Sequence, residues 1–416
     1  MRSVQILVIG GGASGMMAAI MARRSGAKVL IIEKKNRLGK KLLATGNGKC
    51  NFTNRVQKQE CYRSSQKDIP WQIIQKFDWE KCVNWFDEIG ILAKERDGYF
   101  YPASGQATAV LRALERELKR LKVEIHTEEA VEEIVCMERG NVLSGFEVRT
   151  DKSEYLARNV IVSTGGMAAP VHGSTGDGYG YVKRLGHHII TPVPALTSLV
   201  LDGNFMKAWS GVRIQGKVSL YDEKNSLLCE DSGEIQMVAH GISGIPVFQL
   251  SRFAARELAK KRSVILYLDS MPEYDMEWLV EEIKKRQSYD GEQSMGDILE
   301  GMLPDKLAGV FLKKSGIGMV TQAVEVSEAE IQKLAAWIKK MELKVAAVSD
   351  FEKAQVTAGG VALEEICMDT MESKLCKGLY LTGELLDVDG ICGGYNLQWA
   401  WTTGYLAGTA CGQSVK

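Results

Sequence analysis

A buried strand that runs directly into a glycine-rich turn and then a helix constrains this fold more than any other feature of the sequence. Residues 4–9, "VQILVI", are apolar and rich in β-branched side chains, which is typical of a strand buried on both faces of a parallel sheet. "GGGASG" at 10–15 follows, and "MMAAIMARRSG" at 16–26 has the composition of a helix. This order predicts a Rossmann-like domain that binds a dinucleotide.

Each glycine of that turn has its own physical task. Gly10 permits the tight turn, Gly12 lets the backbone approach a diphosphate, and Gly15 allows close contact between helix and strand. The helix N-terminus offers free N–H groups and a partial positive charge to the phosphates. A second strand, "KVLIIE", ends on Glu33, whose carboxylate accepts hydrogen bonds from ribose hydroxyls and repels a 2′-phosphate. The expected nucleotide is therefore FAD or NAD, in preference to NADP.

The next segment, "KKNRLGKKLLATGNGKCNFTN" at 34–54, is basic and contains no acidic residue. A solvated basic loop is the simpler interpretation. We favour a loop that wraps the ligand, because the residues 45–48, "TGNG", combine backbone flexibility with hydrogen-bond donors.

Two later strands are predicted to end at the same edge of the sheet. "EYLARNVIV" at 154–162 runs into Thr164, Gly165 and Gly166, and this turn either has only a structural role or returns the chain to the cofactor. The last strand, "GLYLTGE", ends on Glu384. An acid at that position can accept hydrogen bonds from a ribityl chain, which an NAD site would not require.

A second glycine-rich turn leads into the last helix of the chain. Gly393 and Gly394 are expected to bring the backbone close to the ligand, and a helix begins near Tyr395 and Asn396. Its N–H groups would point at the N1 and C2 carbonyl of an isoalloxazine, where negative charge accumulates on reduction. The sequence therefore predicts that two helix N-termini, from opposite ends of the chain, hold one FAD.

The pattern of predicted strands and helices changes in the middle of the chain. Short strand candidates follow Pro192 and Pro194, then a helix at about 244–260 and the strand "SVILYLD". Apolar residues at three and four spacing predict mostly helix over 275–341. We therefore predict that an α/β FAD-binding domain, formed by 1–192 and 346–416, is interrupted by an insert at 193–345. The insert is expected to be β-rich over 193–270 and helical over 271–345.

Composition narrows the class of partner. Lys plus Arg equals Asp plus Glu at 52 each, so no net positive field favours nucleic acid or an anionic membrane, and we expect a small-molecule substrate. Nine scattered cysteines without a CxxC pair indicate reduced thiols and neither a disulfide framework nor a metal site. The sequence shows no secretion signal and no apolar run near ~20 residues. We expect a cytoplasmic protein without membrane association, and the oligomeric state stays open.

Several longer segments resemble a known family. "VIGGGASGMMAA", "YFYPASGQA", "STGGMAAPVHGSTGDGYGYVKRLGH" and "GLYLTGELLDVDGICGGYNLQWAWTTGYLAG" are similar to bacterial FAD-binding flavoproteins that include aminoacetone oxidase and 3-dehydro-bile acid Δ4,6-reductase, relatives of the two-dinucleotide-domain flavoproteins. The resemblance spans nearly the whole chain. It implies that Glu33 binds the adenosine ribose, that Glu384 binds the ribityl side and that Gly394, Tyr395 and Asn396 meet the flavin ring. It also implies that the insert covers the flavin from the substrate side.

The motifs and the resemblance together predict one set of cofactor-binding residues. Its members are Gly10, Gly12, Ala13, Ser14, Gly15, Glu33, Lys34, Arg37, Lys40, Lys41, Asn47, Gly48, Cys50, Asn51, Val131, Thr164, Gly165, Gly166, Gly383, Glu384, Gly393, Gly394, Tyr395, Asn396 and Leu397.

The catalytic residues are a separate prediction. Reduction of a conjugated C=C bond needs a hydride from the flavin and a proton from a nearby acid. The resemblance places the loop residues His172 and His240 near the flavin, although a loop histidine is more often structural. We assign the proton donor to His240, with Tyr101 as second choice. Because the sequence shows one dinucleotide fingerprint, NAD(P)H is expected as a transient co-substrate, or oxygen reoxidises the flavin.

Three classes of function follow. The first is an NAD(P)H-dependent flavin reductase of an apolar enone, such as a 3-oxo-Δ4 steroid or bile acid. The second is an amine oxidase, such as an aminoacetone oxidase, that uses oxygen. The third is a flavin-bound sensor or an RNA-modifying factor, and the balanced charge argues against its RNA version. We favour them in that order.

Overall fold

The chain divides into two compact units in the computed structural model, which describes residues 1–139, 142–289 and 292–415. Unit 1 combines Met1–Val193 with Gln355–Lys416, and unit 2, here called the insert, is Pro194–Ala354. Each unit has its own hydrophobic core. Two segments that are far apart in sequence therefore build unit 1.

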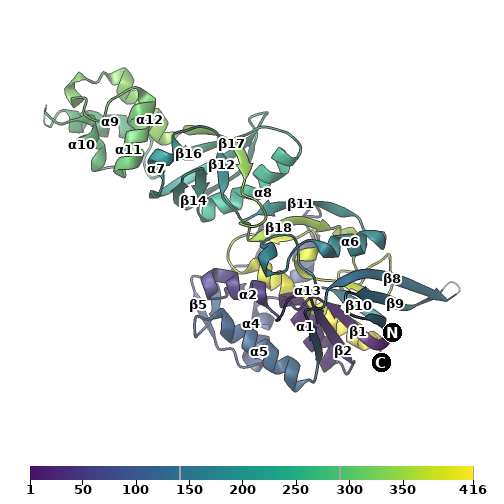
Figure 1. Cartoon of the computed structure of the whole chain (residues 1–416). Coiled ribbons are helices and arrows are strands. Elements are labelled where there is room, and N and C mark those ends of the chain that lie inside the picture. The colour runs from purple at the N-terminus through teal and green to yellow at the C-terminus, as the bar shows by residue number, and fades with distance from the viewer. Residues whose placement is uncertain (140–141, 290–291, 416) are drawn as a thin grey trace. The chain divides into compact units, whose positions relative to one another are not determined.

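A mostly parallel sheet forms the centre of unit 1 (Figure 1). Its order is β7 (Glu124–Thr127), β2 (Val29–Glu33), β1 (Arg2–Ile9), β10 (Glu154–Val162), β9 (Val142–Thr150) and β8 (Val131–Arg139), and β19 (Leu379–Leu381) also pairs with β10. β7, β2, β1, β10 and β19 run parallel to one another. β9 pairs antiparallel with β10 on one side and with β8 on the other. Ile6, Leu7 and Val8 of β1 are fully buried, as expected of a strand covered on both faces. The predicted Rossmann-like α/β fold is confirmed.

Two helices from opposite ends of the chain pack along one another. α1 (Ala13–Arg24) and α13 (Tyr395–Ser414) lie side by side in unit 1 (Figure 1). Glycines repeat every four residues on the contact face of α13: a Cβ atom at Gly404, Gly408 or Gly412 would lie 2.4, 2.2 or 2.7 Å from the carbonyl oxygen of Ser14, Ala18 or Ala22. Such distances are too short for any side chain. The glycines therefore allow the close approach, and the predicted convergence of the two chain ends is confirmed.

Shorter elements complete unit 1 around this core. The helices are α2 (Lys40–Ala44), α3 (Ile69–Ile74), α4 (Trp79–Glu88), α5 (Ala107–Arg120) and α6 (Asp177–Arg184). The small sheets join β3 (Thr53–Asn54), β6 (Tyr99–Pro102) and β5 (Ala93–Arg96); β20 (Asp389–Gly390) and β4 (Tyr62–Arg63); and β11 (Ile189–Ala195) and β18 (Val356–Val361). The 3₁₀ turns η1 (Thr45–Gly48), η3 (Pro170–His172) and η6 (Gly383–Leu385) follow α2, β10 and β19.

The β-rich part of the insert is a closed barrel. Its order is β12 (Leu199–Leu201), β15 (Gly241–Ser243), β14 (Leu227–Val238), β13 (Arg213–Asp222), β16 (Val264–Asp269) and β17 (Met341–Val348). β14 is the longest of these strands and runs without interruption over "LLCEDSGEIQMV". Closure of a barrel removes unpaired strand edges. The strand-to-strand pairing that closes the barrel is not visible in the sequence pattern.

Helices follow the barrel strands, as the apolar spacing predicts. α7 (Met206–Trp209) and α8 (Ile245–Ala259) accompany the barrel, and α9 (Met276–Gln287), α10 (Met295–Glu300), α11 (Asp305–Ser315) and α12 (Glu328–Lys339) come later. The side chains of Asp275, Ser294 and Ser327 cap α9, α10 and α12 by accepting backbone N–H groups, which supplies partners that the first helical turn lacks. None of the described helices is long and apolar enough to cross a membrane.

The second boundary of the insert differs from the one that the sequence indicates. Residues 346–354 are expected in the FAD-binding domain, but they belong to the insert. The cause is β17, which pairs with β12 and β16 and thereby stays within the barrel.

Candidate functional site

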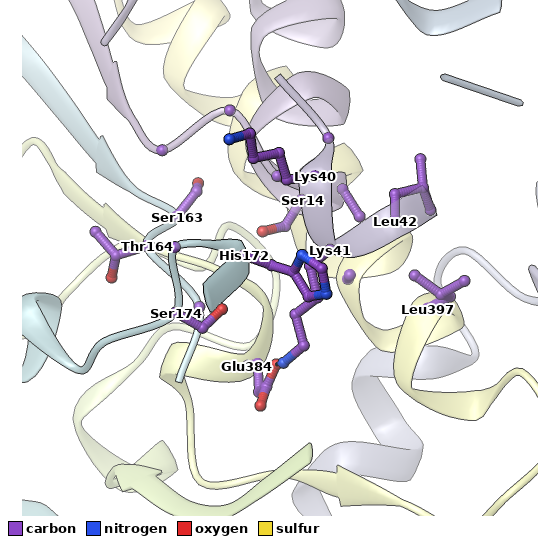
Figure 2. Close-up of a pocket in the computed structure, with 18 of the residues that line it drawn as sticks. Ser14, Lys40, Lys41, Leu42, Ser163, Thr164, His172, Ser174, Glu384 and Leu397 are labelled. Carbon is purple, nitrogen blue, oxygen red and sulfur yellow. Dashed lines mark hydrogen bonds and ion pairs between the residues drawn. The ribbon is translucent and has the colours of Figure 1, made fainter. Parts of the chain in front are cut away.

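A cavity lies at the carboxyl ends of the parallel strands in unit 1 (Figure 2). Its walls come from the turn after β1, the end of β2, the 37–45 segment, the turn after β10 and the N-terminal turn of α13. Glycines, charged side chains and apolar side chains all line it, which is typical of a site that binds a cofactor. In an open α/β sheet this edge is the expected ligand site.

A second cavity of about 430 Å³ continues from the first. Gly10, Glu33, Thr164 and Gly173 line both cavities, and Val131 lines the second. The two together form a long slot that passes the glycine-rich turn. Such a slot suits an extended dinucleotide, with its adenosine in the smaller part and its other end near α13.

The three motif glycines are held in different ways. Gly10 has φ of 100°, and a Cβ atom there would lie 2.5 Å from the Ser163 carbonyl oxygen. A Cβ atom at Gly15 would lie 2.0 Å from the Gly10 carbonyl oxygen. At Gly12, in contrast, a Cβ atom would meet nothing within 4 Å. Gly10 and Gly15 are therefore needed by the fold itself, and Gly12 borders open space at the N-terminus of α1.

Glu33 connects the end of β2 to the glycine-rich turn. Its Oε2 accepts a hydrogen bond from the Gly11 N–H at 2.8 Å, and its Oε1 accepts one from the Lys35 N–H at 2.8 Å. These bonds orient the carboxylate at the junction of the two cavities. Each carboxylate oxygen keeps further acceptor capacity for a ribose hydroxyl.

Glu384 and Lys41 form an ion pair inside the cavity (Figure 2). The Lys41 Nζ lies 2.6 Å from the Glu384 Oε2, and the Glu384 Oε1 accepts a hydrogen bond from the Thr357 N–H at 2.8 Å. About a fifth of the Glu384 side chain is exposed (18%). The pair joins α2 to the turn after β19, so it fixes two cavity walls that are 343 residues apart in sequence.

The cavity carries a surplus of positive charge near the glycine-rich turn. Arg37 and Lys40 line it, and neither forms an ion pair within the part of the chain that the structure describes. Lys34 lies at the second cavity, where it pairs with Asp177 and also donates to Thr175. Cations without a protein partner beside a helix N-terminus suit a diphosphate.

The residues present fit FAD on one further observation. The open space at Gly12 is a cradle that a Cβ atom would fill, where the backbone can approach a diphosphate. The Thr164 hydroxyl, in contrast, packs against α6, because a Cβ atom at Gly178 would lie 2.0 Å from its oxygen.

The structure brings many of the predicted cofactor-binding residues to these two cavities. Those that line one or both are Gly10, Gly12, Ala13, Ser14, Glu33, Lys34, Arg37, Lys40, Lys41, Val131, Thr164, Gly165, Glu384, Asn396 and Leu397. They come from both ends of the chain, and the local motifs account for most of them.

Four predicted residues of the 45–51 loop do not line either cavity. Asn47 and Gly48 are exposed in the left-handed turn η1. Cys50 is fully buried, and burial raises the pKa of its thiol to about 12. The side chain of Asn51 is buried against the α13 turn, because a Cβ atom at Gly394 would lie 2.8 Å from its Oδ1. In the structure this loop supports the wall, and Thr45 is its contribution to the cavity.

The remaining predicted glycines serve packing between segments. A Cβ atom at Gly166 would lie 2.4 Å from the Thr357 Oγ1, and one at Gly383 would lie 2.6 Å from the Ser14 Oγ. Gly15 has the backbone contact described above. None of the three lines a cavity in the described structure. Their backbones allow the cavity walls to come together.

The turn before α13 contacts protein on the side away from the cavity. A Cβ atom at Gly393 would lie 2.8 Å from the Tyr99 ring, and one at Gly394 would lie 2.8 Å from the Thr53 carbonyl oxygen. Tyr395 is buried and donates a hydrogen bond to the Val56 carbonyl oxygen at 2.7 Å. The glycine pair thus brings α13 close to β3, and Asn396 and Leu397 are the first residues of the helix to reach the cavity.

Further lining residues lie outside the predicted set. They are Gly11, Gly39, Leu42, Thr45, Ser163, His172, Gly173, Ser174, Gln355, Val356, Val388, Trp399 and Ala400. Helical periodicity could have found Ala400, which lies one turn after Asn396. Residues 172–174 lie in a segment that resembles the family but outside the glycine-rich turns, and residues 355–356 lie outside these turns too. Both segments reach the cavity through tertiary folding.

The two predicted catalytic residues lie in different units. His240 is exposed in the insert, between β14 and β15, and its carbonyl oxygen accepts from the Leu201 N–H at 3.0 Å. Tyr101 lies on β6 of unit 1, half-buried, and it lines neither cavity of the described residues. Burial raises the pKa of its phenol.

Comparison with known proteins identifies the family. Residues 4–410 match the family described as "HI0933-like protein Rossmann domain". The chain belongs to this family. It is 40% identical to a 3-dehydro-bile acid Δ(4,6)-reductase of Clostridium scindens over 411 residues, which cover 98% of this chain and 99% of the relative. A ribosomal RNA dihydrouridine synthase of Haemophilus influenzae is 27% identical over 420 residues, covering 99% of this chain and 98% of that one.

Solved structures share the fold at low sequence identity. The open conformation of a flavocytochrome c3 fumarate reductase is similar with a TM-score of 0.51 and 16% identity, covering 100% of this chain and 79% of the other. A 3-ketosteroid-Δ4-(5α)-dehydrogenase from Rhodococcus jostii, in complex with 4-androstene-3,17-dione, is similar with a TM-score of 0.50 and 14% identity. The match covers 99% of this chain and 97% of the dehydrogenase. These structures show the fold alone. The family match and the 40% identity to a named reductase over nearly the whole chain show that the chain is an FAD-dependent oxidoreductase.

Proposed function

We propose that this protein reduces a C=C bond conjugated to a carbonyl group in an apolar ring substrate, such as a 3-oxo-Δ4 steroid or bile acid, with NAD(P)H as electron source. The observation that carries the proposal is the full-length similarity, at 40% identity, to a relative named for this chemistry. A relative named for dihydrouridine formation supports the same reaction type, because the C5=C6 bond of uracil is also conjugated to a carbonyl.

Bound FAD supplies hydride chemistry between a nicotinamide and the conjugated bond. The chain's own contribution begins with binding: Glu33 meets the adenosine side, the N-terminus of α1 and the cations Arg37 and Lys40 meet the diphosphate, and α13 meets the flavin end. A helix N-terminus near the flavin stabilises negative charge. We assign the predicted cofactor-binding residues that line the two cavities to this task.

The proton for the product comes from an acid of the protein in this proposal. His240 remains our first assignment and Tyr101 the second. The raised pKa of Tyr101 keeps its phenol protonated at neutral pH, so it can donate a proton there.

Replacement of His240 tests this assignment. We expect His240→Ala to lower turnover of the enone by roughly 10²- to 10⁴-fold, the usual contribution of a general acid, while the FAD absorption spectrum stays unchanged. His188→Ala is the matched control, because His188 is exposed and lines neither described cavity. Turnover equal to that of the unsubstituted enzyme would remove His240 as donor, and Tyr101→Phe would then be measured in the same assay.

An anaerobic spectral titration tests the function itself. We expect NADH or NADPH to bleach the flavin absorption of the purified holoenzyme, and a 3-oxo-Δ4 steroid to restore it with formation of the saturated ketone. Bleaching by an amine alone, followed by hydrogen peroxide formation in air, would contradict the reductase and indicate an amine oxidase.

Reduction of uridine in RNA is a second candidate, favoured by the dihydrouridine synthase relative. It predicts that a uridine-containing ribosomal RNA fragment, and not the steroid, restores the absorption of the reduced flavin. We rank RNA reduction below steroid reduction, because RNA binding ordinarily uses a basic surface. This chain has equal numbers of basic and acidic residues, 52 each.

A further inference from the structure

His172 is a histidine of the main cavity that the sequence motifs do not assign to the cofactor. It ends the short 3₁₀ turn η3 and lines the cavity. Its imidazole forms no hydrogen bond or ion pair within the described part of the chain. Figure 2 shows the ring extending from the 170–174 segment toward the middle of the cavity.

The backbone around His172 is closely held. The His172 N–H donates to the Ala169 carbonyl oxygen at 3.0 Å, and the Gly173 N–H donates to the Pro170 carbonyl oxygen at 2.9 Å. A Cβ atom at Gly173 would lie 3.3 Å from the Lys35 Cγ, so the turn packs against the segment that follows β2. The imidazole is therefore presented to the cavity by a defined turn.

The position along the slot indicates which part of a dinucleotide His172 meets. Gly173, the next residue, lines both cavities together with Gly10 and Glu33. Gly10 begins the turn that precedes the N-terminus of α1. His172 thus approaches the place where a dinucleotide passes from its adenosine to its diphosphate, on a wall that is separate from the glycine-rich turn.

The charges around this place favour an anion. The charged residues that line the cavities or adjoin the turn are Glu33, Lys34, Lys35, Arg37, Lys40, Lys41, Glu129, Asp177 and Glu384. Each of the four acids already has a partner. Glu33 accepts two backbone N–H groups, Asp177 pairs with Lys34, and Glu384 pairs with Lys41. Glu129 accepts hydrogen bonds from the hydroxyls of Thr150 and Tyr155 and lies 3.1 Å from His126 Nδ1. Arg37 and Lys40 have no ion-pair partner among the described residues, so their positive charge is available to the ligand.

We propose that His172 donates a hydrogen bond to the diphosphate of FAD and thereby helps to retain the cofactor. An imidazole carries a ring N–H that can donate, and a hydrogen bond to a charged acceptor is stronger than one between neutral groups. Loss of the imidazole is therefore expected to weaken FAD binding.

The test measures FAD release from the purified holoenzyme on dilution, through the fluorescence of free flavin. We expect His172→Phe, which keeps a planar ring and removes both ring nitrogens, to raise the dissociation constant roughly tenfold, the scale of one hydrogen bond to a charged group. His172→Gln should bind more tightly than His172→Phe, because its amide keeps an N–H donor. His188→Gln, which removes an exposed imidazole outside the cavities, should behave like the unsubstituted protein.

Competitors locate the contact. ADP should lose affinity for the FAD-free His172→Phe protein by the same factor as FAD, and riboflavin, which lacks the diphosphate, should lose none. Equal FAD affinity in His172→Phe and the unsubstituted protein would overturn the proposal, and so would a loss confined to riboflavin. Circular dichroism of each variant establishes that it is folded. No substrate is present, so the result is independent of the proposed reaction.

Discussion

The Gly12→Ala protein is expected to fold as stably as the unsubstituted protein and to lose FAD. Gly12 has φ of −78° and ψ of −170°, which an alanine adopts without strain. The added Cβ atom meets no protein atom within 4 Å, but it projects into the space where the backbone approaches the diphosphate. We expect roughly 10- to 100-fold weaker FAD binding, the scale of one methyl group forced into a closely packed contact.

Thermal melting with and without FAD separates the two effects. Added FAD should raise the melting temperature of the unsubstituted protein through mass action and have little effect on Gly12→Ala, whereas the two FAD-free proteins should melt together. Gly15→Ala is the matched comparison, because its Cβ atom would lie 2.0 Å from the Gly10 carbonyl oxygen. It should destabilise the FAD-free protein itself. Full FAD affinity in Gly12→Ala would show that no dinucleotide approaches this turn.

The Gly408→Ala protein is expected to be less stable, although alanine is the better helix former. A Cβ atom at Gly408 would lie 2.2 Å from the Ala18 carbonyl oxygen and 2.8 Å from its Cα. Both are backbone atoms, so α1 and α13 must move apart. We expect a loss of about 3 kcal/mol in the free energy of unfolding, at the upper end for overpacking. FAD binding should weaken as well, since the N-terminal turns of both helices line the cavity.

Gly180→Ala is the control, because it is expected to raise the free energy of unfolding, whereas Gly408→Ala is expected to lower it. Gly180 lies in α6, is exposed, and a Cβ atom there would meet nothing within 4 Å. Alanine in this helix should add roughly 0.5–1 kcal/mol through helix propensity alone. Urea denaturation of both variants, with free flavin followed in parallel, checks the pair. An unchanged midpoint in Gly408→Ala would mean that α1 and α13 are not held together by this contact.

The parts of the site that could be predicted from sequence are those with local causes. The turn at 10–15 and the acid at Glu33 follow from the geometry that a strand, a tight turn and a helix impose within about 25 residues. Glu384 was reachable because it directly follows a short apolar strand. It was harder to predict whether the loop residues Asn47 and Gly48 contact the ligand, because backbone flexibility and hydrogen-bond donors indicate only that a loop can wrap a ligand. In the structure both residues are exposed.

Tertiary contacts decided the rest. Gly393 and Gly394 suggest a backbone that approaches a ligand, but in the structure they approach Tyr99 and Thr53. A glycine in the sequence indicates that something comes close, and only the fold reveals what it is. His172 is a second case: the family resemblance placed it near the flavin, and the structure shows that its segment reaches the cavity through packing against the residues that follow β2.

By itself, the sequence determined the Rossmann-like fold class and the glycine-rich turns, because periodicity and turn chemistry act between neighbouring residues. The meeting of the two chain ends was predicted only because both turns were expected to bind one ligand. The tertiary structure alone decided the closure of the barrel, the assignment of residues 346–354 to the insert, and which side chains face the cavity. Those outcomes depend on pairing and packing between segments that are far apart in the chain, and no local pattern records such contacts.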